Sequence, residues 1–171
     1  NEWDTRSADE QLADAQHQAD LVRLGLAGNL RTFAFETTAG EVQEGWEIDY
    51  NGQEAGYADS PEEIITYVDK HDNETLFDIL TLKLPTDTPM ADRVRMNTVS
   101  LATTALSQTP TFFHAGSDLL RSKSLDRNSY NSGDWFNLLD FSGQDNGFAR
   151  GLPQAGDNQD KWPFMRGLLA D

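Results

Sequence analysis

The sequence contains no cysteine among its 171 residues, which excludes a disulfide framework and a thiolate metal site. Basic residues are scarce, because 13 Lys and Arg stand against 29 Asp and Glu, a formal net charge of −16. Such a charge repels phosphate backbones, so no nucleic-acid partner is expected. No apolar run approaches the ~18 residues of a membrane helix, so no membrane span is expected. An initial Met and a basic-then-apolar leader are also missing, from which we expect a processed or cut chain.

The residues that are present suit one compact domain. A hydrophobic content of 37%, with 10% aromatics, is enough to build a core. The acidic charge is uneven, since positions 1–120 hold 22 acids and 7 bases whereas positions 121–171 hold 7 acids and 6 bases. We interpret this pattern as a solvated acidic surface that favours solubility.

Apolar spacing predicts helices, and β-branched runs predict strands. Ser7 and Glu10 fit the S-x-x-E pattern of a capping box, and Gly28 supplies a stop. Residues 64–68 are all β-branched or aromatic, which is typical of a strand buried on both faces. The predicted ranges are helices at about 8–27, 74–84 and 90–107 and strands at about 30–35, 64–68 and 110–113. Strand, helices and strand in this order form a βαβ unit, and residues 121–161 lack periodicity, which indicates a long functional loop.

Polar clusters follow two of the predicted strands. His71, Asp72 and Asn73 follow the strand at 64–68, and a second cluster at 114–118 follows the strand at 110–113. In a parallel α/β barrel, function gathers where strands end. On spacing alone, however, the favoured reading is that Asp72 or Asn73 caps the helix beginning near residue 74.

The long loop contains the run YNSGDWFN at positions 130–137. Aromatic faces beside carboxylate and amide groups are what a neutral sugar needs, although the same residues also suit a loop of turns with aromatics in the core. The common nucleophile, metalloprotease, phosphate-binding and dinucleotide motifs are absent from the sequence. The three His lie far apart, so no zinc site is expected; a calcium site stays open, although no loop has EF-hand spacing.

Three segments together resemble glycoside hydrolase family 13, the α-amylase superfamily. Residues 67–76, YVDKHDNETL, resemble its fourth conserved region. Residues 112–137, with the runs LRSKS and YNSGDWFN, resemble the last barrel strand and following loop of pullulanases and limit dextrinases. Residues 19–30 and 47–52 are similar to the stretch that precedes the fourth region, and the likeness extends from about residue 7 to 153.

The resemblance implies a fold and an activity. The fold is α/β, and residues 1–171 form a partial catalytic domain: about strands six to eight of a TIM (β/α)₈ barrel, with the long substrate loop at about 121–161 after the last strand. The activity is hydrolysis, with retention, of the α-1,6 branch bonds of α-glucans such as pullulan, amylopectin and limit dextrins. Likeness to bacterial pullulanases favours a secreted or periplasmic location. No cofactor is implied, and a structural calcium ion in the complete enzyme stays open.

The resemblance also assigns roles to residues. Asp72 is the carboxylate that stabilises the transition state, and His71 hydrogen-bonds the sugar in the same subsite. Asp134 matches a loop Asp that binds glucose units on the non-reducing side of the cut. The other residues expected to bind substrate are Asn73, Asn131 and Trp135.

Departures from the family pattern are equally informative. A retaining glycosidase needs a nucleophile and a general acid about 5–5.5 Å apart, and this family takes them from R-x-D and G-E-x-W motifs. Neither motif occurs, and the superficially similar run at 44–46 lies on the wrong side of the matched segment. Leu138 also stands where relatives usually carry a basic residue. We therefore expect a fragment that is inactive alone and needs the N-terminal part of the barrel.

Two alternatives remain. In the first, the chain is a non-catalytic α-glucan-binding module that uses Asp134, Trp135 and Phe136. In the second, it is part of another family-13 enzyme such as an isoamylase or a neopullulanase. The YNSGDWFN run speaks against the second of these.

Overall fold

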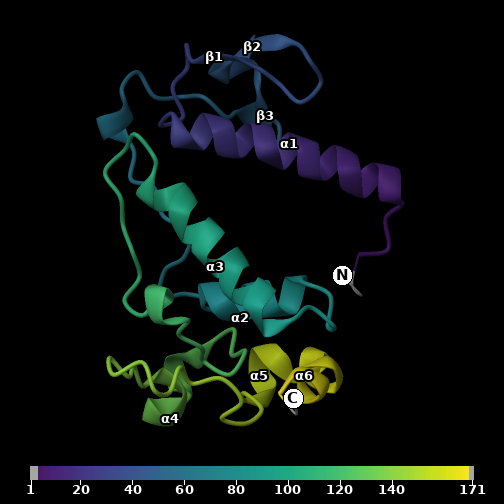
Figure 1. The fold of residues 1–171 in the computed structure, drawn as a ribbon, viewed down its shortest axis with the longest axis vertical. Helices are drawn as coiled ribbons and strands as arrows, with labels where there is room; N and C mark the ends of the chain where they lie inside the picture. Colours follow the sequence, from purple (N-terminus) through teal and green to yellow (C-terminus); the bar gives the residue numbers. More distant parts are fainter. Residues whose placement is uncertain (1–3, 170–171) are drawn as a thin grey trace. The chain divides into compact units, whose positions relative to one another are not determined.

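The structure is a computed structural model that describes residues 4–169 (Figure 1). The chain divides into two compact units. Of the residues described, the N-terminal unit comprises residues 4–67 together with Ala102–Phe112, and the C-terminal unit comprises Val68–Leu101 and residues 113–169. Each unit has its own apolar core.

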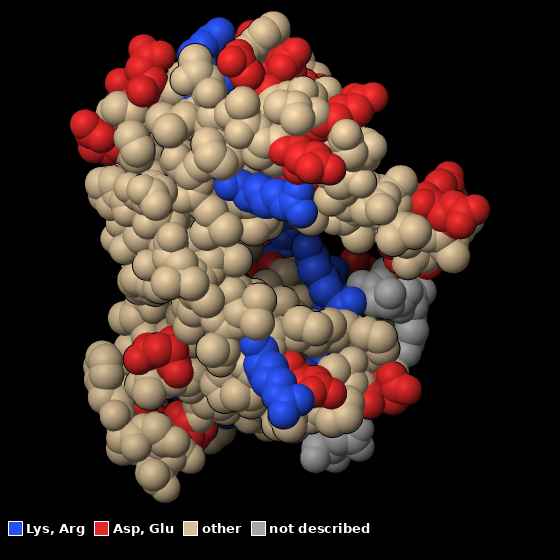
Figure 2. All heavy atoms as spheres, turned by 45° about the horizontal axis from the view of Figure 1, so that its top comes forward, with Lys and Arg blue, Asp and Glu red and all other residues tan. Residues whose placement is uncertain are grey.

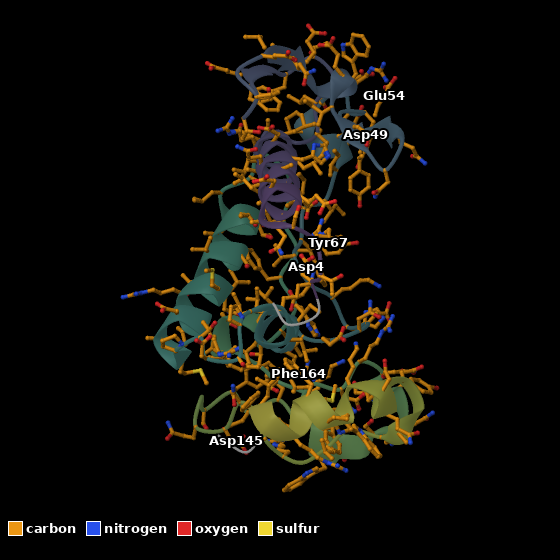
Figure 3. The ribbon with its side chains drawn as sticks, turned by 90° about the vertical axis from the view of Figure 1, so that its right-hand side faces the viewer. Asp4, Asp49, Glu54, Tyr67, Asp145 and Phe164 are labelled. Carbon is orange, nitrogen blue, oxygen red and sulfur yellow. The ribbon has the colours of Figure 1, made fainter. Side chains whose placement is uncertain are left out.

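The N-terminal unit is built on one long helix and two small antiparallel hairpins. Helix α1 spans Ala8–Leu26 and begins at a capping box, in which Ser7 and Glu10 satisfy each other's backbone amides. The strands are β1 (Ala34–Glu36) paired with β2 (Val42–Glu44), and β3 (Asp49–Tyr50) paired with β4 (Gln53–Glu54); Asp49 and Glu54 face each other across the second hairpin (Figure 3). The core consists of Leu24, Ile48 and Ala55, with Leu21 and Phe35 packed against them.

The strand predicted at 30–35 has a different extent and partner. Strand β1 covers only Ala34–Glu36, and it pairs with the next segment of chain in antiparallel fashion instead of entering a parallel sheet. Phe33 and Phe35 do lie on one side, with ring centroids 5.5 Å apart. Leu30 forms an isolated parallel bridge to Ala58. The alternation of Phe33 and Phe35 therefore does indicate extended chain, but this chain forms a local hairpin.

The strands predicted at 64–68 and 110–113 are wrong as continuous strands. Their pairing is reduced to one parallel bridge between Thr66 and Thr111. The Thr66 amide donates to the Pro110 carbonyl, and the Phe112 amide donates to the Thr66 carbonyl, each at 3.0 Å. Ile65 is 62% exposed, so this run is not buried on both faces. Among residues 4–169 no closed barrel is formed, because both sheets that the structure describes have two strands.

The C-terminal unit contains most of the helices. They are α2 (Leu76–Lys83), α3 (Met90–Ala105, which continues into the N-terminal unit), α4 (Gly133–Asn137), α5 (Ala155–Asn158) and α6 (Trp162–Leu168). The core of this unit consists of Leu82, Leu125, Met165 and Leu168. Phe164, which Figure 3 labels on α6, packs against this core.

The segment predicted as an irregular loop at 121–161 contains short helical turns. Besides α4 and α5 it forms 3₁₀ turns at Ser129–Asn131 and Gln159–Lys161. Polar side chains give it order, because the fully buried Asp126 accepts hydrogen bonds from Ser132 at 2.5 Å and from Asn158 at 3.0 Å. Short turns held by polar hydrogen bonds leave no apolar periodicity in the sequence, which explains why the prediction missed these turns.

Acidic side chains are spread in small groups over the face shown in Figure 2, with fewer basic side chains between them. In the part of the chain that is described, no helix is long and apolar enough to cross a membrane.

Candidate functional site

Asp72 lies on an exposed turn before α2. Its side chain is 54% exposed and forms an ion pair with Lys70, and its Oδ1 lies 3.5 Å from Nε2 of His71. The hydrogen bond from Lys70, followed by the charge of His71, holds the pKa of Asp72 below its ordinary value. The carboxylate is therefore ionised at neutral pH and presents acceptor oxygens to solvent.

Helix α2 is not capped by Asp72 or Asn73, so the capping interpretation of these two residues is wrong. The N-cap is Thr75, whose hydroxyl accepts a hydrogen bond from the Asp78 amide at 3.2 Å. The side chains of Asp72 and Asn73 are consequently not needed to cap α2.

A buried lysine, Lys123, forms a hydrogen bond to the backbone of this turn. Asn73 adopts a left-handed conformation with φ of 61°, which Asn tolerates better than most residues. Its carbonyl accepts a hydrogen bond from Nζ of Lys123 at 2.6 Å. Lys123 is 3% exposed, and burial lowers the pKa of its ammonium while Asp126 and Asp78 oppose that shift.

A polar cavity of about 260 Å³ opens beside the turn. This volume is near the lower end of the range of about 300–1,000 Å³ that ligand pockets occupy. The residues that line it are His71, Asp72, Asn73, Lys123, Arg127, Asn128, Ser129, Tyr130 and Asn137, all in the C-terminal unit. Hydroxyl, amide, carboxylate and guanidinium groups together provide the donors and acceptors that a polyol requires.

Three of the predicted site residues come together in this cavity and three do not. His71, Asp72 and Asn73 line it, whereas Asn131, Asp134 and Trp135 lie on the following turn and on α4, outside its lining. The carbonyl of Asn131 accepts a hydrogen bond from Gln154 at 2.6 Å. Trp135 is 64% exposed, with a surface available for stacking.

Several lining residues were missed by sequence reasoning. Lys123 lies within LRSKS and Tyr130, which is 89% exposed, begins YNSGDWFN, whereas Arg127, Asn128 and Ser129 lie in the stretch between the two runs. The signal that could have found Arg127, Asn128 and Ser129 is their position between the two runs that carry the resemblance.

His114, from the second predicted polar cluster, supports the loop from within. Asp69 is buried and accepts a hydrogen bond from Ser117 at 2.5 Å, with Nδ1 of His114 3.6 Å away. Arg121 lies 3.3 Å from Nε2 of His114 and donates to the carbonyl of Asn137 at 2.8 Å. Burial lowers the pKa of His114, so the ring is neutral at pH 7 and accepts from Arg121 at Nε2.

Among residues 4–169, no group of three or more His, Cys, Asp or Glu side chains is arranged to hold a metal ion. At the cavity, Asp72 pairs with Lys70, and Lys123 donates to the Asn73 carbonyl.

Comparisons with known proteins point in one direction. The chain is 50% identical to the pullulanase of Klebsiella aerogenes over 165 residues, which are 96% of this chain and 15% of that protein. It is 46% identical over 151 residues to the chloroplastic pullulanase 1 of Arabidopsis thaliana, covering 88% of this chain and 16% of the relative. No protein-family model matches the chain.

Solved structures agree with the sequence comparison. The apo pullulanase of Klebsiella pneumoniae matches with a TM-score of 0.89 and 47% identity, covering 98% of this chain and 18% of that one. The PulA protein of Klebsiella oxytoca matches with a TM-score of 0.90 over 99% of this chain and 16% of that one. A maltotriose complex of the Klebsiella pneumoniae protein matches equally, with a TM-score of 0.89 over 98% of this chain and 18% of that one.

The chain thus spans about one sixth of the length of the curated relatives that it matches. Over that segment the resemblance to pullulanases stated from the sequence is confirmed: the chain is homologous to a segment of the pullulanases.

Proposed function

We propose that this chain is the C-terminal barrel portion, about strands six to eight, of a debranching glycoside hydrolase that cleaves α-1,6-glucosidic bonds with retention. Its substrates are pullulan, amylopectin and limit dextrins. The observation that carries the proposal is Asp72, an exposed carboxylate kept ionised by Lys70 and His71 at a polar cavity, in a chain 50% identical to a pullulanase. The parallel bridge between Thr66 and Thr111 supports neighbouring barrel strands.

In this proposal Asp72 stabilises the transition state. Cleavage of a glycosidic bond passes through an oxocarbenium-like state, and hydrogen bonds to the sugar 2-OH tighten as that state forms. A carboxylate ionised in the free protein can accept such a bond and oppose the developing positive charge. His71, 83% exposed beside Asp72, is placed to hydrogen-bond the same sugar.

The other roles follow the family pattern. Asn73 contacts sugar in the cavity, and Asn131, Asp134 and Trp135 bind glucose units along the adjoining loop, which the exposure of Trp135 supports. The reaction needs no cofactor, and the location is secreted or periplasmic. Because the R-x-D and G-E-x-W motifs are absent, the chain alone lacks a nucleophile and a general acid and has no turnover.

A hybrid enzyme tests the proposal. This chain replaces the matched segment of the Klebsiella pneumoniae pullulanase, and reducing ends released from pullulan are measured. We expect the hybrid to be active and Asp72→Asn to lower kcat at least about 100-fold. Asp118→Asn, which neutralises an exposed carboxylate outside the cavity, should change kcat less than about twofold.

Two results would contradict the proposal. An active hybrid that is indifferent to Asp72→Asn removes the assigned role of this carboxylate. Turnover of pullulan by the isolated chain, abolished by Asp72→Asn, shows that the chain supplies its own nucleophile and acid. Maltotriose binding by the isolated chain, followed by Trp fluorescence, together with an inactive but folded hybrid would favour the non-catalytic α-glucan-binding module.

A further inference from the structure

The run LRSKS forms a buried hub within the C-terminal unit. Residues 122–124 are each at most 3% exposed, and Arg121 is half-buried. The four polar side chains of the run reach four different partners: Arg121 the Asn137 carbonyl at 2.8 Å, Ser122 the Asp78 carboxylate at 2.5 Å, Lys123 the Asn73 carbonyl at 2.6 Å, and Ser124 the Gly151 carbonyl at 2.6 Å. These four bonds hold separate parts of the loop region together, which gives the polar residues of this run a structural role.

Lys123 is a buried cation within this hub. Taking an ammonium group out of water is unfavourable unless charge partners and acceptors compensate it. Burial is the main cause of its lowered pKa, with the carboxylates of Asp126 and Asp78 acting in the opposite sense. A purely apolar contact would fill this space at less cost, so the use of a charged donor indicates that the bond to Asn73 matters.

That bond acts on the peptide between Asn73 and Glu74, one residue beyond Asp72. The carboxylate of Asp72 is exposed, and Lys70 and His71 beside it are themselves 43% and 83% exposed, so burial does not fix its direction. Its direction is set by the backbone of the turn, which passes through the left-handed residue Asn73. Lys123 fixes that backbone at the Asn73 carbonyl.

We propose that Lys123 is a positioning residue that aims the Asp72 carboxylate, and that it is not a ligand of the sugar. The inference rests on the proposed function of Asp72 and deepens it. Because a displacement of about 1 Å can cost on the order of 100-fold in rate, an unpinned turn should lower kcat while leaving KM nearly unchanged.

A double-mutant cycle in the hybrid enzyme tests this inference. Lys123→Met keeps the length of the side chain and removes its donor and charge. We expect it to lower kcat on pullulan about 10–100-fold when Asp72 is present and less than about threefold in the Asp72→Asn background. The matched control is Lys83→Met, an exposed lysine in the last turn of α2, which should change kcat less than about twofold.

Each outcome decides the matter. Equal losses in both backgrounds, or a raised KM with unchanged kcat, overturn the positioning role, and the second would make Lys123 a sugar ligand. A small effect of Asp72→Asn itself contradicts the proposed function instead. If Lys123→Met melts below the assay temperature, the four variants of the cycle are compared at a temperature below that melting point, and the same criteria apply.

Discussion

Oγ of Ser122 donates a hydrogen bond to Oδ1 of Asp78 at 2.5 Å, across 44 positions of sequence. The second oxygen of this carboxylate accepts from the backbone amide of Lys123 at 2.7 Å. Asp78 is fully buried in α2, so these bonds fasten that helix to the hub that holds the Asp72 turn. Both the stability of the C-terminal unit and the geometry of the candidate site thus depend on the buried carboxylate of Asp78.

Ser122→Ala should destabilise the chain. The change leaves a buried carboxylate oxygen without its hydroxyl donor, which typically costs about 1–3 kcal/mol. Urea unfolding followed by circular dichroism measures the effect. Ser142→Ala, which removes a hydroxyl from an exposed loop where it bonds to Asp140, should stay within about 0.5 kcal/mol. Equal effects of the two substitutions would show that the Ser122 bond contributes nothing particular.

Asp78 should also make stability depend on pH. Burial raises the pKa of Asp78 from 3.8 to about 6 in the folded chain, against the hydrogen bonds from Ser122 and Lys123. Between these values the folded state binds more protons than the unfolded state, so the contribution of Asp78 to the free energy of unfolding falls as pH rises from about 4 to about 6. The fall is at most about 3 kcal/mol.

Carboxylates such as Asp72 and Asp145, whose pKa values are lowered, act in the opposite sense, so the comparison with Asp78→Asn isolates this group. The measurement is the free energy of unfolding of both chains at pH 4, 5, 6 and 7. We expect the difference between parent and Asp78→Asn to shrink with rising pH. A difference that is constant over this range contradicts the assignment.

Local sequence signals gave the helices, because their caps and apolar spacing are short-range. The capping box of Ser7 and Glu10 and the stop before Pro85 mark the ends of α1 and α2 within a few residues. The apolar run at 64–68 could not reveal its own pairing, since a strand depends on neighbours elsewhere in the chain. It forms one bridge in the structure and leaves Ile65 exposed.

The candidate site divides in the same way. His71, Asp72 and Asn73 were singled out because residues 67–76 resemble a conserved region of a known family, whereas spacing alone favoured a helix cap. Lys123 could not be found by spacing, because its bond to Asn73 joins residues 50 positions apart. The polar residues of a loop are expected to be exposed, and the sequence does not reveal which of them are buried. Here Lys123 and Asp126 are buried.

Arg150→Met should release Trp135. The guanidinium of Arg150 donates to the Trp135 carbonyl at 2.7 Å, lies 5.6 Å from the centroid of its ring and pairs with Asp145. The indole Nε1 of Trp135 also donates to the backbone carbonyl of Arg150 at 2.9 Å, a bond that the substitution keeps, so the change tests the side-chain contacts alone. Losing these contacts should cost about 1–3 kcal/mol and shift the Trp135 contribution to the fluorescence emission toward longer wavelength, read as the difference from a Trp135→Phe chain. Arg166→Met, an exposed arginine on α6, is the control. An unchanged emission difference would mean that Arg150 does not hold the indole.

Gly45→Ala should unfold the N-terminal unit. A Cβ at this position would lie 2.1 Å from the Leu30 carbonyl oxygen and 2.8 Å from Cδ1 of Leu24, both in or beside the core, so backbone and packed side chains must move. Overpacking of this kind costs about 3 kcal/mol or more when backbone is displaced. The control is Gly25→Ala in α1, where the nearest atom is 3.9 Å from the new Cβ, and where the added methyl should stabilise the helix by about 0.5–1 kcal/mol. Hydrogen exchange of the α1 amides measures both effects, because exchange should accelerate in Gly45→Ala and slow in Gly25→Ala; protection equal to the parent in Gly45→Ala would show that this close approach is absent in solution.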